Sequence, residues 1–260
     1  MIPKIIHYCW FSDPPQYPQD VLNCMRSWRE KLPDYEIKLW NASNFDLSEC
    51  PYAQEAYNEK KYAFASDYVR LWVLYHYGGI YLDSDIEVLK NFDDLLDNPA
   101  FTGFEDKKRI AAWIFGSEKG NPIFKEFLDY YTDRHFIQSE GQYDLTPNPV
   151  PITNCLIRHG LQLNGLYQKL EGITVYPMDT FCPFNPYRDG PNYFTKNTYA
   201  NHHFNGGWLS SEQKIQNAIA RKKRKKALRI DKIIHFPNRL LMRILGDEKY
   251  DSLKKKIKRG

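Results

Sequence analysis

The sequence predicts one α/β domain built on a mostly parallel sheet, followed by a basic helical tail. A strand, a helix and a second strand follow one another within the first forty residues, which is the signature of a βαβ unit. The 260 residues are 42% hydrophobic and 15% aromatic, enough for one large buried core. No stretch approaches the roughly 18 consecutive apolar residues of a membrane-spanning helix.

The first three elements establish the βαβ order. Residues 2–11 are rich in β-branched and aromatic side chains and end at the turn signal of residues 12–15, so we expect a buried strand. Apolar side chains at helical spacing predict a helix over 18–31. Polar and apolar residues alternate over 35–40, which predicts a second strand.

The middle of the chain predicts a long buried helix that leads into a strand. Residues 53–77 have a helical pattern, and their second half is apolar. Gly78 and Gly79 end this helix. The β-prone run 80–89 follows, with two carboxylates at its centre.

The remaining elements complete a domain that we place at residues 1–215, before a tail at 216–260. The pattern predicts short elements at 100–104 and 110–115, a helix at 122–131, a Pro-rich loop at 146–151, a helix near 154–164 and a strand at 172–176.

The formal net charge of +4 divides unevenly along the chain. Residues 1–220 hold 20 basic and 28 acidic side chains, whereas residues 221–260 hold 16 basic and 4 acidic ones. Apolar residues at helical spacing among these cations predict an amphipathic helix on an anionic membrane surface. A solvated helix face is the alternative. We expect no nucleic-acid binding, because the acidic body carries no motif for it.

The cysteines and the N-terminus bear on localisation. The five cysteines are scattered and include no C-x-x-C pair, which fits neither a disulfide framework nor a zinc knuckle. The N-terminal apolar run is too short for a secretory signal. We therefore expect a cytoplasmic protein, associated with the cytoplasmic face of the membrane through residues 221–260.

The D-x-D segment at residues 83–85 indicates the chemistry most clearly. Side chains two apart in a strand point to one face, so Asp83 and Asp85 should present two carboxylates together. Crowded carboxylates repel each other unless a cation lies between them, and oxygen ligands suit Mn²⁺ or Mg²⁺. A polar turn without a ligand is the alternative.

Asp67 and Arg70 lie on one face of the preceding helix, in a segment where charged groups must be paired or used. They form a structural ion pair, or they bind sugar hydroxyls and a diphosphate. Because this helix leads through two glycines into the D-x-D segment, we expect both motifs to belong to one site.

Three motifs in this order resemble glycosyltransferase family 32, the D-x-D glycosyltransferases. That family includes yeast-type initiating mannosyltransferases, bacterial capsule transferases and, more distantly, the clostridial glucosylating toxins. The matching residues are Ile2-Pro3-Lys4-Ile5-Ile6-His7-Tyr8-Cys9-Trp10, Ala65-Ser66-Asp67-Tyr68-Val69-Arg70 and Gly78-Gly79-Ile80-Tyr81-Leu82-Asp83-Ser84-Asp85. The resemblance implies a GT-A fold with a Rossmann-like mixed sheet, and a nucleotide-diphosphate sugar as donor, with a UDP-sugar favoured.

The same resemblance implies which residues bind the nucleotide. Trp10 stacks on the base, and Cys9 offers backbone contacts. Ser66 and Tyr81 line the nucleotide and phosphate region. For Trp10 and Tyr81, ordinary core packing is the alternative.

The resemblance also implies which residues carry the reaction. Asp67 and Arg70 hold hydroxyls of the donor sugar, with Arg70 close to the diphosphate. Asp83 faces the ribose and the metal, and Asp85 binds the metal directly. The anomeric configuration is retained, through front-face attack by an acceptor hydroxyl. No residue is nominated as a covalent nucleophile.

A late motif, Tyr199-Ala200-Asn201-His202-His203-Phe204-Asn205-Gly206-Gly207-Trp208, resembles the family's C-terminal histidine motif. An imidazole completes a carboxylate-rich metal site. The H-x-x-G spacing favours His203 as the ligand, with His202 as the alternate, and Trp208 closes over the leaving phosphate. Gly207 stands where many relatives have Ser, so this position offers no hydroxyl to the diphosphate. A surface histidine pair is the alternative.

The leading hypothesis is a metal-dependent, retaining hexosyltransferase that acts on a glycan or lipid-linked oligosaccharide acceptor in surface or capsular polysaccharide assembly. One alternative is a phosphatase of the haloacid dehalogenase type, with Asp83 as nucleophile. Glu87 argues against it, because that class usually has Thr or Val at this position. The other alternative is a non-catalytic adaptor whose basic tail binds lipid or nucleic acid.

Overall fold

The computed structural model describes residues 1–12, 16–185, 194–206 and 219. The chain divides into two compact units, Met1–Trp208 and Leu209–Gly260. Apart from residue 219, the second unit lies outside the described residues, so the predicted domain boundary and the basic tail at 216–260 stay predictions. In the part of the chain that is described, no helix is both long and apolar enough to cross a membrane.

The first unit is built on a seven-stranded mixed sheet with the strand order β2-β1-β3-β6-β5-β8-β7. Its strands are β1 (Ile5–Cys9), β2 (Glu36–Trp40), β3 (Gly79–Leu82), β5 (Ala100–Gly103), β6 (Ile114–Ser117), β7 (Gln168–Leu170) and β8 (Ile173–Tyr176). A second sheet pairs β4 (Ile86–Val88) antiparallel with β9 (Ala200–His202). The helices are α1 (Gln19–Lys31), α2 (Pro51–Asn58), α3 (Tyr62–Tyr77), α4 (Pro122–Asp129), α5 (Pro149–Arg158) and α6 (Met178–Phe181).

The α/β class is confirmed, but the large sheet is mixed rather than mostly parallel. Strand β1 is parallel to both β2 and β3, and β5 is parallel to β8. Strand β6 is antiparallel to β3 and to β5. The connection from β5 to β6 contains no helix, and a chain that returns directly to its neighbour must run antiparallel to it.

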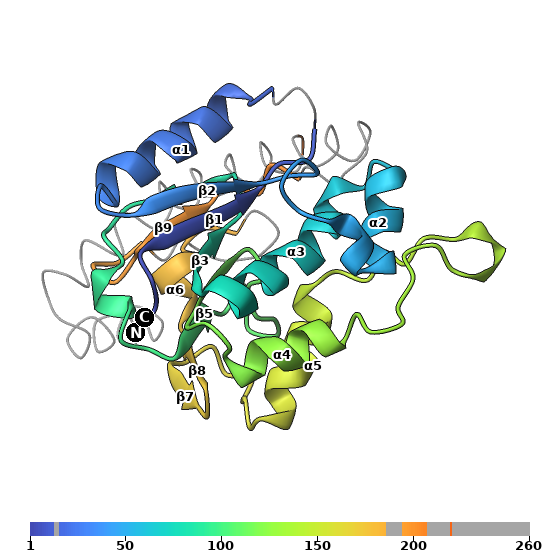
Figure 1. Ribbon diagram of the computed structural model, residues 1–260. Coiled ribbons are helices and arrows are strands. Elements are labelled where there is room, and N and C mark those ends of the chain that lie inside the picture. The colour runs from blue at the N-terminus through green and yellow to red at the C-terminus, as the bar shows by residue number, and fades with distance from the viewer. Residues whose placement is uncertain (13–15, 186–193, 207–218, 220–260) are drawn as a thin grey trace, which may run out of the picture. The chain divides into compact units, whose positions relative to one another are not determined.

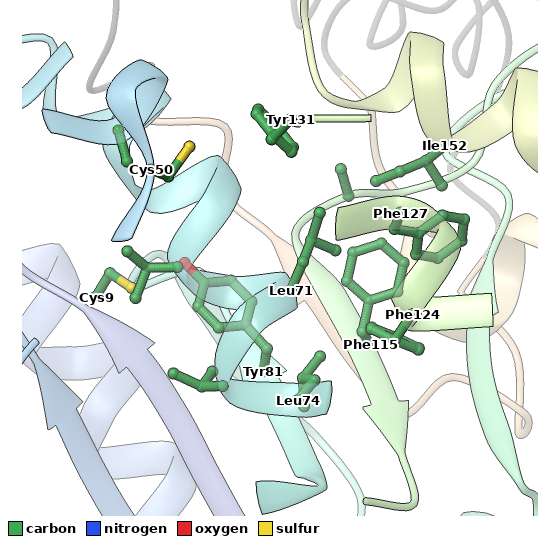
Figure 2. Packing of buried hydrophobic residues seen from close by; sticks show 14 of the residues in the cluster. Cys9, Cys50, Leu71, Leu74, Tyr81, Phe115, Phe124, Phe127, Tyr131 and Ile152 are labelled. Carbon is green, nitrogen blue, oxygen red and sulfur yellow. The ribbon is translucent and has the colours of Figure 1, made fainter. Parts of the chain in front are cut away.

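Helices cover both faces of the large sheet (Figure 1). On one face, Trp28 of α1 packs in the same cluster as Ile80 of β3. On the other face, α3 and α4 contribute to a cluster in which Tyr81 of β3 lies beside Leu74 (Figure 2). Successive residues of β3 therefore enter opposite cores, as expected when side chains alternate along a strand.

Three predicted boundaries are wrong. The helix expected over 53–77 is two helices, because the chain takes a left-handed turn at Lys60, where φ is 57°. The second half of the Pro-rich loop expected at 146–151 is the start of α5, since proline fits the first helical turn, where no backbone N–H is needed; the helix expected near 154–164 therefore begins at Pro149 and ends at Arg158. The strand expected over 80–89 is two strands in different sheets, β3 and β4.

The turn at Gly78 and Gly79 fixes where β3 begins. Their φ angles are 69° and 103°, a region that residues with a side chain rarely adopt. His7 lies against this turn: its Nε2 donates to Gly78 O at 2.9 Å, while its Nδ1 accepts from Trp40 Nε1 at 2.9 Å. A Cβ on Gly79 would lie 2.8 Å from His7 Nε2. Burial lowers the pKa of His7 to about 4, so this histidine is neutral at pH 7.

Candidate active site

The predicted site residues gather at the carboxyl ends of β1 and β3. These strands are parallel and adjacent, so both end at the same edge of the sheet. Ligands of α/β sheets bind at such edges. Trp10 follows β1, Asp83 follows β3, and Asp67 and Arg70 come from the middle of α3.

The D-x-D residues lie in a turn, not within a strand. Strand β3 ends at Leu82, and Ile86 N donates to Asp83 O at 3.1 Å, which closes a four-residue turn. The expectation that strand alternation aligns the two carboxylates is therefore wrong. Asp83 and Asp85 lie together because both belong to this turn, which connects β3 of the large sheet to β4 of the two-stranded sheet.

The pairing of β4 with β9 brings a histidine to this turn from far along the chain. Ile86 lies opposite His202, and His202 Nε2 lies 3.2 Å from Asp85 Oδ1. Ligand atoms of Asp83, Asp85 and His202 all lie within 4.8 Å of one another. Asn205 N donates to the second oxygen of Asp85 at 2.8 Å. We call the side chains of Asp83, Asp85 and His202 the D-x-D cluster.

Charge and packing hold His202 in this position. Its ring lies 4.6 Å from that of Trp113 and stacks on Phe204 at 3.9 Å. Burial by itself lowers the pKa of His202, but Asp85 reverses this effect and raises it. Burial likewise opposes ionisation of Asp85, yet His202 and the backbone N–H of Asn205 lower the pKa of Asp85 to about 2. Asp85 is therefore a carboxylate at neutral pH.

The structure reverses the predicted preference between the two histidines. His203, favoured by its H-x-x-G spacing, lies with Nε2 3.0 Å from Glu87 Oε2. His202, the alternate, is the one beside Asp85. Neighbouring residues of an extended segment point to opposite sides, so only one of the two can face the turn.

Arg70 joins the helix motif to the D-x-D segment. Its Nη2 lies 3.0 Å from Asp67 Oδ1 and 3.3 Å from Asp83 Oδ1. Its Nη1 donates to Ala112 O, and Nη2 also donates to Ser66 Oγ at 3.0 Å. The ion pair between Asp67 and Arg70 and the expected site shared with Asp83 are therefore both present. Both depend on Arg70, which is only 5% exposed.

Burial also sets the electrostatics of the two carboxylates around Arg70. Desolvation raises the pKa of Asp67 to about 6, although Arg70 opposes this change. Desolvation raises the pKa of Asp83 as well, again against the guanidinium. One cation therefore faces two carboxylates in a buried site. This arrangement favours either a proton or an added cation.

Tyr81 combines packing with a site contact. Its ring is buried, and the guanidinium carbon of Arg70 lies 4.9 Å from the ring centroid. Its hydroxyl donates to Asp83 Oδ1 at 3.0 Å. Burial raises the pKa of Tyr81, which keeps the hydroxyl protonated as a donor. Tyr81 and Arg70 both contact Oδ1 of Asp83 and orient that carboxylate.

The roles implied for the nucleotide-side residues stay predictions. Cys9 ends β1 and is buried beside Tyr81 in one apolar cluster (Figure 2). Trp10 lies against Tyr17, with ring centroids 4.8 Å apart. Ser66 Oγ donates to Ala63 O at 2.7 Å. Trp208 lies outside the described residues.

Four site contacts come from residues that the sequence analysis missed. The backbone of Ala112 and Asn205 contributes, and no sequence pattern marks backbone groups. Asn148 donates through Nδ2 to Asp67 O at 3.0 Å. The Glu105 side chain is largely buried, which raises its pKa, and its negative charge contributes to raising the pKa of His202. The sequence near Asn148 and Glu105 has no periodic signal that distinguishes these positions from ordinary loop residues.

The D-x-D cluster suits a divalent cation. Two carboxylates and one imidazole are ligands that Mn²⁺ and Mg²⁺ accept, with Mn²⁺ tolerating the nitrogen better. The geometric requirement is met, because the three ligand atoms already converge. Arg70 adds a fixed positive group next to the cluster, where a diphosphate would also bind.

Comparisons with known proteins find similarity to glycosyltransferases. The family model "Glycosyltransferase sugar-binding region containing DXD motif" matches residues 18–102. Inositol phosphoceramide mannosyltransferase 3 of Schizosaccharomyces pombe is 34% identical over 131 residues, which cover 49% of this chain and 36% of that protein. Mannosyl phosphorylinositol ceramide synthase SUR1 of Saccharomyces cerevisiae is 30% identical over 134 residues, 49% of this chain and 34% of that protein.

Among solved structures, the PaToxG glycosyltransferase has a TM-score of 0.47 and 22% identity, over 60% of this chain and 69% of that one. The fold and the site define the class: an α/β domain with a mixed sheet and a glycosyltransferase D-x-D turn at the end of β3. The predicted resemblance is confirmed over residues 18–102, which match the glycosyltransferase sugar-binding region containing a DXD motif. The match spans about a third of the length of the two curated relatives.

Proposed function

We propose that this protein is a divalent-metal-dependent glycosyltransferase that moves a hexose from a nucleotide-diphosphate sugar to a hydroxyl of a glycan acceptor. One observation carries this proposal. Asp83, Asp85 and His202 form a partly buried ligand cluster that adjoins the guanidinium of Arg70. The site thus combines ligands for a cation with a fixed cation for an anion.

The chemistry follows from where charge develops. Negative charge grows on the diphosphate as its bond to the sugar breaks, and a divalent ion, when bound, stabilises that charge. Asp83, Asp85 and His202 would hold the ion. Arg70 is fixed by Ala112 and Ser66 before the substrate arrives, so little reorganisation is needed when its guanidinium stabilises the same charge.

The carboxylates around the guanidinium have separate tasks in this proposal. Asp67 faces the donor sugar and accepts hydrogen bonds from its hydroxyls. Asp83 is oriented by Tyr81 and Arg70, which share its Oδ1, so it serves as a ligand rather than as a nucleophile. Retention of configuration by front-face attack is consistent with this assignment, because no covalent intermediate on Asp83 is required.

The names of the relatives suggest which donor and acceptor to test first. Both curated relatives reported above act with mannose on an inositol phosphoceramide. We therefore propose mannose as the first hexose to test, as both GDP- and UDP-sugar, with UDP-glucose and UDP-galactose beside it. A lipid-borne acceptor, as predicted for surface polysaccharide, would place the enzyme at the cytoplasmic membrane face.

A thermal-shift screen with and without Mn²⁺ tests the donor, followed by measurement of sugar transfer and donor hydrolysis. We expect one nucleotide sugar to raise the melting temperature only with the metal present. Asp85→Asn should lose both the shift and the activity, whereas the exposed control Asp129→Asn should keep both. Full activity of Asp85→Asn would overturn the proposal, and a phosphate trapped on Asp83 would favour the phosphatase alternative.

The basic tail is the proposed membrane contact. Residues 221–260 lie outside the described residues, so the support is their charge, 16 basic against 4 acidic side chains. Removing them should abolish binding to anionic liposomes and leave donor hydrolysis intact. Equal liposome binding by the truncated protein would contradict this division of tasks.

A further inference from the structure

A second cluster of ligand-bearing side chains lies between α4 and α5. Glu126 Oε1 lies 2.8 Å from His159 Nε2, and Glu126 Oε2 lies 3.5 Å from Cys155 Sγ. One ligand atom from each residue lies within 4.8 Å of the other two. We call Glu126, Cys155 and His159 the interhelix cluster.

The local structure explains why these three side chains meet. Cys155 lies in α5 and His159 is its C-terminal cap, so a spacing of four residues places them one turn apart on the same side. Glu126 comes from the middle of α4. Apolar contacts fix the two helices independently, because Phe124 and Phe127 lie beside Ile152 in the core (Figure 2).

We propose that the interhelix cluster is a Zn²⁺ site with Glu126, Cys155 and His159 as its three protein ligands. Thiolate, imidazole and carboxylate are the three ligand types that zinc uses in proteins, at about 2.0–2.3 Å. Ligands at those distances in a tetrahedron lie about 3.3–3.8 Å apart. The present separations of 2.8 and 3.5 Å therefore need only small side-chain shifts.

The surroundings leave a fourth coordination position. Glu126 and Cys155 line a cavity of about 470 Å³, and Asn148 lines the same cavity. Asn148 is 3% exposed, and its Oδ1 has no hydrogen-bond partner in the structure as described. A water molecule bound to the zinc on this side would face the same cavity as Asn148 Oδ1 and could exchange through it.

One nearby cation opposes the metal. Arg158 Nη2 lies 3.9 Å from Glu126 Oε2, but the Arg158 side chain is 65% exposed and can turn into water. The ligand types also separate the two clusters, because sulfur favours Zn²⁺ over the Mn²⁺ or Mg²⁺ that suits the D-x-D cluster. Bound zinc would tie α5 to α4. Asn148, immediately before α5, also contacts Asp67.

Cobalt substitution in the full-length protein tests the proposal. A thiolate bound to Co²⁺ gives an intense near-ultraviolet charge-transfer band, which carboxylate and imidazole ligands do not give. We expect this band on addition of Co²⁺ and its loss when one equivalent of Zn²⁺ displaces the cobalt. Absence of the band in the unmodified protein overturns the proposal.

Variants identify the ligands without any measurement of transferase activity. Cys155→Ser should lose the band, whereas Cys50→Ser, at another buried cysteine, should keep it. The side chains of His159 and Glu126 are 29% and 40% exposed, so His159→Gln and Glu126→Gln should fold and bind Zn²⁺ at least about tenfold more weakly. If the band persisted in Cys155→Ser, or if His159→Gln and Glu126→Gln both kept the full zinc affinity, the zinc site would be excluded. The three side chains would then form only a hydrogen-bonded group.

Discussion

The D-x-D cluster and the interhelix cluster each bring together three ligands, yet they are supported differently. The D-x-D cluster joins residues more than a hundred positions apart through the β4–β9 pairing, and it adjoins the buried charge of Arg70. The interhelix cluster joins two packed helices, and the cation beside it, Arg158, is exposed. The number of ligands is therefore a poor guide to function, since the surrounding charge decides whether a site also suits an anionic substrate.

Removing the central guanidinium should give the largest effect. Arg70→Met leaves the buried carboxyl group of Asp67 and the partly exposed one of Asp83 without the cation that they share, so the free energy of unfolding should fall by about 3–5 kcal/mol in urea titrations. Arg158→Met, beside the other cluster, removes an exposed charge and should change it by less than about 0.5 kcal/mol. If both substitutions lowered the free energy of unfolding equally, the two clusters would not differ in how strongly stability depends on the neighbouring arginine.

Removing one carboxylate from each cluster should separate their functions. Asp85→Asn should lower sugar transfer by about 10²–10³-fold, because the cation site loses a charged ligand. Glu126→Gln should leave transfer within about twofold, since that cluster lies outside the proposed chemistry. Steady-state kinetics at saturating Mn²⁺ measure both. A comparable loss in Glu126→Gln would join the two clusters in one function.

The contribution of His7, which packs against the turn before β3, to the free energy of unfolding should depend on pH. His7 has a pKa of about 4 in the folded protein and about 6.5 when unfolded, so the unfolded chain binds more protons between these values. The free energy of unfolding should therefore fall as the pH drops from 6.5 to 4, by up to about 3 kcal/mol. His7→Gln should be less stable at pH 7 and should lack this component. An identical pH profile in the variant would exclude His7 as the source.

The smallest effect should distinguish the two neighbouring histidines. His202→Gln removes a ligand of the D-x-D cluster and should weaken Mn²⁺ binding by about 10–100-fold. His203→Gln breaks only a half-exposed contact with Glu87 and should leave Mn²⁺ affinity within about twofold. Isothermal titration calorimetry measures both variants. The reverse ranking would restore the assignment that the H-x-x-G spacing favoured.

Much of the site could be predicted because it depends on local geometry. Asp67 and Arg70 share a helix face at any position in a fold, since three residues make almost one turn. The adjacent Gly-Gly and D-x-D motifs placed Asp83 and Asp85 near them. The alignment of the two carboxylates was predicted for the wrong reason, because the end of β3 at Leu82 depends on pairing with β1 and β6.

Local patterns in the chain were enough to predict the α/β class, the D-x-D motif and the grouping of its carboxylates with Asp67 and Arg70. The position of His202 rather than His203 at the turn, and the meeting of Cys155 with Glu126, became visible only in the folded protein. The difference lies in the range of the interactions. Covalent geometry fixes neighbours within a turn or a strand, whereas the β4–β9 register and the packing of α4 against α5 depend on burying apolar surface from distant segments.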